Sequence, residues 1–155
     1  MAETPPALRR AVAADRDAVA RVTGAAYKPY VKRLGYKPKP MTADHAPWIE
    51  DGSVWVLDTG AGIIGVLVLL DGPDGLLIYN VAVAPAEQHR GNGRRLMAFA
   101  EEQAKKLGYA RIILYTNEKM TENIRFYEKL GYTPYARLEH PTRGKAWLIH
   151  LNKFI

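Results

Sequence analysis

The sequence predicts a mixed α+β fold in which a mostly antiparallel, twisted central sheet of about six to seven strands is flanked by helices. Three β-rich segments follow one another between Ser53 and Ala84 with only turn residues between them, which favours antiparallel pairing. Two later segments have helical periodicity and alternate with strands, which requires some parallel pairing. The 155 residues are enough for a core of ordinary size, and we expect one domain over residues 1–155.

The first half of the chain opens with a short predicted strand, Leu8 to Val12, and a helix, Asp15 to Tyr27. The helix has apolar residues at helical spacing and aspartates near its start. Residues 28–50 contain four prolines, so we expect this segment to be irregular and only partly helical. Three strands are predicted next: Ser53 to Asp58, Ile63 to Leu70, and Leu76 to Ala84.

The second half begins with a long helix that Gly91-Asn92-Gly93 opens and that ends at Leu107, before a glycine stop. Its apolar residues recur at i, i+3, i+4, i+8 and i+11, which is one face of a helix. Thr121 is the expected N-cap of the next helix. The remaining predicted elements are a strand over 110–115, a helix over 121–130, and strands over 133–139 and 145–152.

Composition limits the classes of function. The chain has no cysteine, which excludes disulfides, cysteine-ligated metals and a cysteine nucleophile. Its four histidines lack metal-ligand spacing, so we expect no metal site. We find neither a signal peptide nor an apolar stretch long enough to cross a bilayer, and we expect a cytoplasmic protein that does not bind membranes. The net charge of +6 favours an anionic partner, such as a phosphorylated cofactor or an acidic substrate.

The most informative segment lies between the third predicted strand and the long helix. Gly91 and Gly93 stand at the start of that helix, directly after a strand and a proline-led turn. The first turn of a helix has unpaired N–H groups and the positive end of the helix dipole, and glycine lets a phosphate approach the backbone closely. Arg90, Arg94 and Arg95 add positive charge around this turn. The glycine spacing matches neither a dinucleotide fingerprint nor a P-loop.

Gln88-x-x-Gly91-x-Gly93 resembles the [QR]-x-x-G-x-[GA] signature of the GNAT superfamily of N-acetyltransferases. Downstream, the segment 122–132 resembles the A-x-x-x-Y-x-K-x-G-[FY] helix of that family. The resemblance covers nearly the whole chain, and it implies a GNAT-like fold that binds acetyl-CoA and transfers its acetyl group directly to an amine. It also implies a set of cofactor-binding residues: Val81, Ala82, Val83, Gln88, His89, Arg90, Gly91, Asn92, Gly93, Arg94 and Asn123.

By the same resemblance, Tyr127 is the catalytic residue that protonates the departing CoA thiolate. The backbone of 81–83 would bind the pantetheine amides and stabilise the oxyanion. Asn123 stands where the family often has alanine, and either hydrogen-bonds the cofactor or caps the helix. Some relatives place a glutamate base where this chain has Leu77. Tyr79, which shares the strand parity of Val81, Asn80 and an ordered water are the alternatives.

The expected acceptor is a small-molecule or peptide amine bound by the variable region 27–48 and the final hairpin, with Tyr27, Tyr30 and Tyr79 as substrate-binding residues. Tyr36 and Trp48 extend this aromatic wall. Because this region also carries five basic residues, we expect an amine that bears an anionic group. The five basic residues are Lys28, Lys32, Arg33, Lys37 and Lys39.

Two other classes of function compete with catalysis. A GNAT-like domain that binds acyl-CoA without transferring the acyl group is the alternative. Nucleic-acid binding is disfavoured because the basic residues are dispersed and no recognition motif accompanies them. We expect a monomer or a homodimer.

Overall fold

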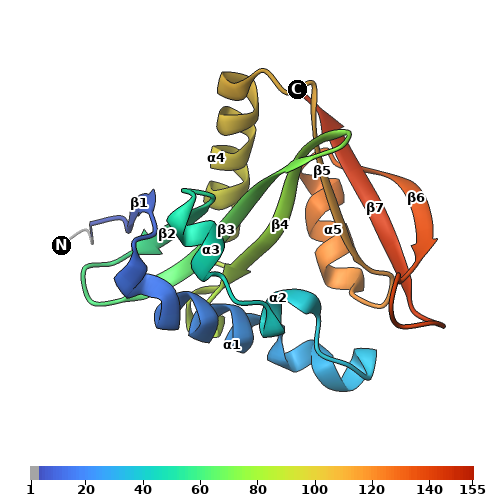
Figure 1. Ribbon diagram of the computed structural model, residues 1–155, viewed down its shortest axis with the longest axis horizontal. Helices are drawn as coiled ribbons and strands as arrows, with labels where there is room; N and C mark the ends of the chain where they lie inside the picture. The colour runs from blue at the N-terminus through green and yellow to red at the C-terminus, as the bar shows by residue number, and fades with distance from the viewer. Residues whose placement is uncertain (1–3) are drawn as a thin grey trace.

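The computed structural model describes residues 4–155, which form one seven-stranded sheet in the order β1-β2-β3-β4-β5-β7-β6 (Figure 1). Neighbouring strands are antiparallel except β4 and β5, which are parallel, so the predicted fold class is confirmed. The strands are β1 (Ala7–Arg10), β2 (Val54–Asp58), β3 (Ile63–Gly72), β4 (Gly75–Val83), β5 (Arg111–Asn117), β6 (Thr133–Glu139) and β7 (Trp147–Phe154).

Helices cover both faces of this sheet, and Figure 1 shows α1 and α4 on opposite sides of β3 and β4. One core contains buried residues of α4 and α5, such as Leu96 and Tyr127, packed with Leu67 of β3. The other core contains Val19 of α1 and Ile49 of α3. The helices are α1 (Arg16–Leu34), α2 (Lys39–Thr42), α3 (Ala46–Glu50), α4 (Asn92–Leu107) and α5 (Thr121–Lys129), with 3₁₀ turns η1 (Ala13–Asp15) and η2 (Pro85–Glu87).

Helix α1 is longer than the sequence predicts. It continues through Pro29 to Leu34, and Gly35 ends it with a φ of 81° and an N–H bond to the carbonyl of Val31. Proline has no N–H to donate inside a helix, which is why an end near Tyr27 was expected. The apolar face of the helix nevertheless continues at Tyr27 and Val31, which are partly buried, and at Leu34, which is buried. Burial of this face favours the helix despite the hydrogen bond lost at the proline. Residues 28–50 are therefore mostly helical, which corrects the prediction of an irregular segment.

A β-bulge interrupts β4 opposite β3. Val68 pairs with Asn80 and the next residue, Leu69, pairs with Ile78, so Tyr79 has no partner across the strands. A bulge adds one residue and shifts the alternation of side chains. Tyr79 consequently packs with the α1 and α3 core, while Val81 packs with the α4 and α5 core. The predicted shared parity of Tyr79 and Val81 is wrong for this reason.

The two parallel strands separate soon after they begin. β4 and β5 pair only through Leu76 with Ile112 and Leu77 with Ile113, and Figure 1 shows them diverging beyond that point. Parallel strands need a crossover connection, which here is α4. β5 also extends to Asn117, two residues past the predicted end. The strands thus leave a space between the carboxyl half of β4 and that of β5.

Candidate active site

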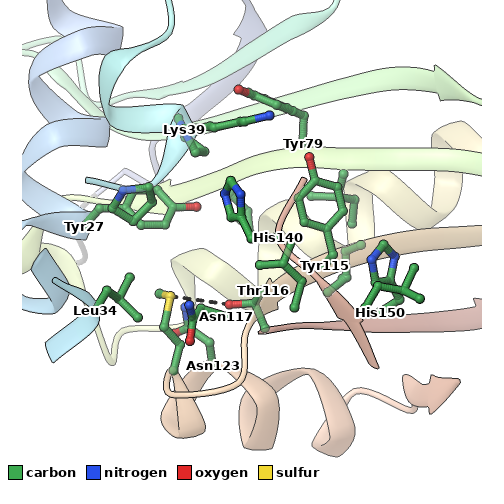
Figure 2. A pocket seen from close by; sticks show the side chains of 18 of the residues that line it. Tyr27, Leu34, Lys39, Tyr79, Tyr115, Thr116, Asn117, Asn123, His140 and His150 are labelled. Atoms are coloured by element: carbon green, nitrogen blue, oxygen red, sulfur yellow. Dashed lines mark hydrogen bonds between the residues drawn. The ribbon is translucent and has the colours of Figure 1, made fainter. Parts of the chain in front are cut away.

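A cavity of about 300 Å³ occupies this space between β4 and β5. Figure 2 shows side chains from α1, both strands, α5 and the β6–β7 hairpin gathered around it. Its wall is mainly aromatic and apolar, with polar groups at intervals, as in small-molecule sites. The lining residues include Tyr27, Leu34, Tyr36, Lys39, Tyr79, Val81, Tyr115, Asn117, Asn123, Tyr127, Glu139, His140 and His150.

The turn that leads from β4 into α4 has an unusual backbone. Gly91 precedes the helix with a φ of 86°, and His89 also has a positive φ, 64°. The N–H of Arg95 bonds to the carbonyl of Gly91, so the N–H groups of residues 92–94 precede the first intrahelical bond. Free N–H groups at the positive end of a helix dipole form a site that suits a phosphate.

Two side chains shape this turn. Gln88 Nε2 donates a hydrogen bond to the carbonyl of Val83 at 3.0 Å. Asn92 Nδ2 donates to the carbonyl of Glu87 at 2.9 Å. Gln88 and Asn92 therefore hold the turn in a conformation that leaves the N–H groups of residues 92–94 free for a ligand. The predicted contact of these two side chains with a cofactor stays a prediction.

The arginines near the turn differ in their contacts. Arg90 lies 3.5 Å from the carboxylate of Glu87, and Arg94 is exposed. Arg95 directs its guanidinium away, to the carbonyl of Pro6. The prediction that Arg95 adds positive charge to the turn is therefore wrong, because its side chain instead connects α4 to the segment before β1.

Residues 81–83 separate into three environments. Val81 lines the cavity, and Ala82 is buried in the opposite core at 3% exposure. The carbonyl of Val83 accepts the bond from Gln88. Val81 is thus the member of this predicted group that lies beside the cavity.

Tyr127 is buried at 8% exposure and lines the cavity from α5. Burial, with a smaller effect of the neighbouring Tyr30 phenol, raises the pKa of its hydroxyl above the ordinary value. Its hydroxyl therefore retains its proton at neutral pH. Asn123 lies one turn earlier on the same face and also lines the cavity. Met120 is the N-cap of α5, so the predicted caps at Thr121 and Asn123 are both wrong.

Two of the three tyrosines predicted to bind substrate reach the cavity. Tyr27 of α1 and Tyr79 of the bulge line it, and burial raises the pKa of both hydroxyls. Tyr79 also packs on Trp48 with ring centroids 4.7 Å apart. Tyr30 lies outside the lining and packs under the guanidinium of Arg33, so it is not part of this wall.

The structure changes which residues are candidates for the general base. Leu77 pairs with Ile113 where the two strands are still joined, outside the cavity lining. His150 of β7, which the sequence analysis did not single out, lines the cavity beside Tyr115, with ring centroids 5.3 Å apart. Burial lowers the pKa of His150, which keeps its imidazole neutral near pH 7. The antiparallel pairing of Tyr115 with His150 is the tertiary contact that brings it there.

Asn80 faces the other way. Its side-chain amide donates to Thr23 Oγ1 at 3.0 Å and to His45 Nε2 at 3.2 Å, and all three residues are buried. His45 Nδ1 lies 3.1 Å from the carbonyl of Ala43, which only accepts, so the proton of the neutral ring is on Nδ1. Asn80 therefore ties α1 and the segment before α3 to the bulge and does not line the cavity.

Comparison with known proteins identifies the family. The protein-family model of the acetyltransferase (GNAT) domain matches residues 50–134, more than half of the chain. The chain belongs to the GNAT family of acetyltransferases.

Relatives within GNAT differ in length and name. The chain is 28% identical over 124 residues to a mycothiol acetyltransferase of Thermomonospora curvata, covering 79% of this chain and 42% of that protein. It is 34% identical over 86 residues to the uncharacterized N-acetyltransferase YvbK of Bacillus subtilis, covering 55% of this chain and 56% of that one. The chain thus spans between 42% and 56% of these two relatives.

The fold of solved GNAT proteins agrees with this assignment. PaiA N-acetyltransferase of Thermoplasma acidophilum, solved in complex with coenzyme A, superposes with a TM-score of 0.74 at 17% identity, covering 93% of this chain and 96% of that one. At this identity the likeness concerns the fold alone. No helix in residues 4–155 of this GNAT chain is long and apolar enough to cross a bilayer. In the same residues, no group of three or more His, Asp or Glu side chains is arranged to hold a metal ion.

Proposed function

We propose that this GNAT chain transfers the acetyl group of acetyl-CoA directly to a primary amine, and that residues 1–155 act as one domain. Residues 1–3 lie outside the described part of the chain. The observation that carries the proposal is the cavity between β4 and β5, which has the side chain of Tyr127, a residue that is 8% exposed, on its wall. The names of the relatives, which include N-acetyltransferases, and the coenzyme A complex of PaiA support the choice of substrates.

In the proposed complex, the pyrophosphate of acetyl-CoA lies against the first turn of α4, and the acetyl end reaches the cavity beside Val81. The N–H groups of residues 92–94 and the left-handed Gly91 support this orientation. Backbone donors at Val81 would stabilise the oxyanion of the tetrahedral intermediate, a contribution of about 2.7–4 kcal/mol in related chemistry.

The proposed reaction needs one base and one acid. The ammonium group of the acceptor loses a proton to His150, directly or through a water, and the neutral amine attacks the thioester carbonyl. When the intermediate collapses, the C–S bond breaks and Tyr127 donates its proton to the departing thiolate. The Tyr127 phenolate then recovers a proton from the positively charged nitrogen, which becomes the neutral amide. His140 is less suitable as the base, because its Nδ1 accepts from the N–H of Thr142 at 3.2 Å. Its neutral ring then carries the proton on Nε2, where it can only donate.

A thiol-release assay with acetyl-CoA and a panel of primary amines tests this proposal. We expect amine-dependent release of CoA together with an acetylated product in the mass spectrum. Calorimetry with acetyl-CoA separates the alternative function, a binding module without transfer. Tight binding without product formation for any amine would favour the binding module, and the absence of binding would contradict both.

A further inference from the structure

A second cavity, also about 300 Å³, adjoins the first. The two cavities share Leu34, Tyr36 and Asn117 in their linings, so these side chains form the boundary between them. Asn117 Nδ2 donates to the hydroxyl of Tyr36 at 2.7 Å, which holds the end of β5 against the segment that follows α1. We refer to this second cavity as the basic pocket because of its charged lining.

Three cations line the basic pocket: Lys119 before α5, and Arg143 and Lys145 in the β6–β7 hairpin. Among residues 4–155, none of them lies within ion-pair distance of a carboxylate. The one acidic residue among the described lining residues, Glu118, already accepts two hydrogen bonds from Arg137, at 2.8 and 3.1 Å. The pocket therefore has an excess of positive charge that the described part of the protein does not neutralise.

Arg143 lies at the boundary between the basic pocket and the first cavity. Its guanidinium lies 4.8 Å from the ring centroid of Tyr36, as a cation–π contact. On the other side, Lys39 and His140 line the first cavity. The pKa of His140 is lowered by burial and further by Lys39 and Arg143, which is consistent with positive potential on both sides of the boundary. Glu139 opposes this charge in the first cavity, and its carboxylate accepts a bond from the N–H of Lys145 at 3.4 Å.

We propose that the basic pocket binds a carboxylate or phosphate of the acceptor while the amine of the same molecule lies in the first cavity. The inference rests on the proposed function and adds the acceptor class: a primary amine with an anionic group several bonds away. Cationic side chains without a carboxylate partner can bind an anion through charge-assisted hydrogen bonds, and a concave basic site concentrates anionic ligands. Only Lys39, of the five basic residues that the sequence analysis associated with the acceptor, lines either cavity.

Matched pairs of amines test this inference. We would measure KM for ω-amino carboxylates from glycine to 6-aminohexanoate, each against its amide, and for O-phosphoethanolamine. At one chain length we expect the carboxylate to have a KM about tenfold lower than its amide, as one charge-assisted hydrogen bond would produce. A lower KM for the phosphate than for every carboxylate would identify phosphate as the preferred anion.

The double variant Arg143→Gln/Lys145→Gln should bring the carboxylate and amide KM values together, without changing the KM for acetyl-CoA. The control Lys105→Gln/Lys106→Gln removes the same charge from the end of α4, outside both cavity linings, and should keep the preference. Equal KM values for acid and amide in the unmodified protein, or a preference that survives the double variant, would overturn the inference.

A binding measurement separates this inference from the proposed function. Calorimetric titration of the CoA-loaded protein with the N-acetylated ω-amino carboxylates of the same series, and with their amides, does not depend on turnover. Tighter binding of the acid at one chain length, lost in the double variant, supports the basic pocket even if no amine is acetylated. Equal binding of acid and amide at every length overturns it even if acetylation proceeds.

Discussion

Tyr127 is the residue whose hydroxyl matters most to the proposed chemistry. Tyr127→Phe removes only the oxygen from a side chain that is 8% exposed, so the packing of α5 should be retained. We expect kcat to fall about 10²–10⁴-fold, because the thiolate loses its proton donor, while the affinity for acetyl-CoA changes little. Steady-state kinetics with calorimetry would check this. An unchanged kcat, with chemistry limiting turnover, would reduce Tyr127 to a packing residue.

His150 is the second residue with a proposed catalytic role. His150→Gln keeps a polar side chain beside Tyr115 but cannot take up a proton. We expect kcat/KM to fall about 10²-fold near pH 7 and the acidic limb of its pH profile to change, because the base is gone. Since burial lowers the pKa of His150, that limb should lie below the ordinary histidine value of 6.5 in the unmodified protein. The same loss at every pH, without a change of profile, would contradict the assignment.

At the scale of elements, the start of α4 decides cofactor binding. Gly91→Glu puts a negative charge beside the free N–H groups of the first turn, where we place the pyrophosphate. Gly91→Asn provides the matched control, because any side chain at a φ of 86° is strained but asparagine tolerates this region and adds no charge.

We expect the glutamate variant to lose at least tenfold in acetyl-CoA affinity by calorimetry, and the asparagine variant to lose much less. Equal affinities for the two variants would show that charge at this turn is not the deciding property. The phosphate would then have to lie elsewhere. Among residues 4–155, and apart from the chain neighbours of Gly91, no heavy atom lies within 4 Å of a Cβ placed at this position, so steric exclusion by the fold does not confuse the comparison.

At the scale of the whole molecule, buried neutral histidines make the stability depend on pH. Burial lowers the pKa of His45, and its Nε2 accepts a hydrogen bond from the side-chain amide of Asn80. Protonation of Nε2 would therefore place two donors, its own N–H and the amide N–H, opposite each other. The unfolded chain binds the proton more readily. The free energy of unfolding should therefore be highest above pH 6.5 and fall as the pH drops below that value, by at most about 1.4 kcal/mol for this histidine at one unit below.

Denaturant unfolding at pH 7.5 and 5.5 checks this expectation. His45→Gln preserves an acceptor for Asn80 but cannot be protonated, so it should make the difference between the two pH values smaller. His140 and His150 contribute with the same sign, because burial lowers the pKa of each, and part of the difference should remain. A pH dependence identical to that of the unmodified protein would exclude His45 as a source.

Features that depend on local chemistry could be predicted from the amino-acid sequence. The paired glycines at 91 and 93 predict a helix start with free N–H groups, and the structure has that start at Asn92. The β-rich segments predict about six to seven strands, and the seven strands of the sheet lie close to the predicted ranges. These signals are readable because turn geometry, helix periodicity and strand periodicity act between residues that are near in sequence.

Which side chains meet in the cavity and in the basic pocket depends on the folded arrangement and could not be predicted from the sequence. The bulge at Tyr79 depends on register against β3, and it moved Tyr79 and Asn80 to the side of α1. His150 reaches the cavity through pairing of β7 with β5, and the cations of the basic pocket come from the hairpin and the loop before α5. Such contacts join segments that are far apart in the chain, and no periodicity within one segment records them. The physical reason is that strand register and helix packing are set by burial of the whole core, so the identity of the neighbours is a property of the folded molecule.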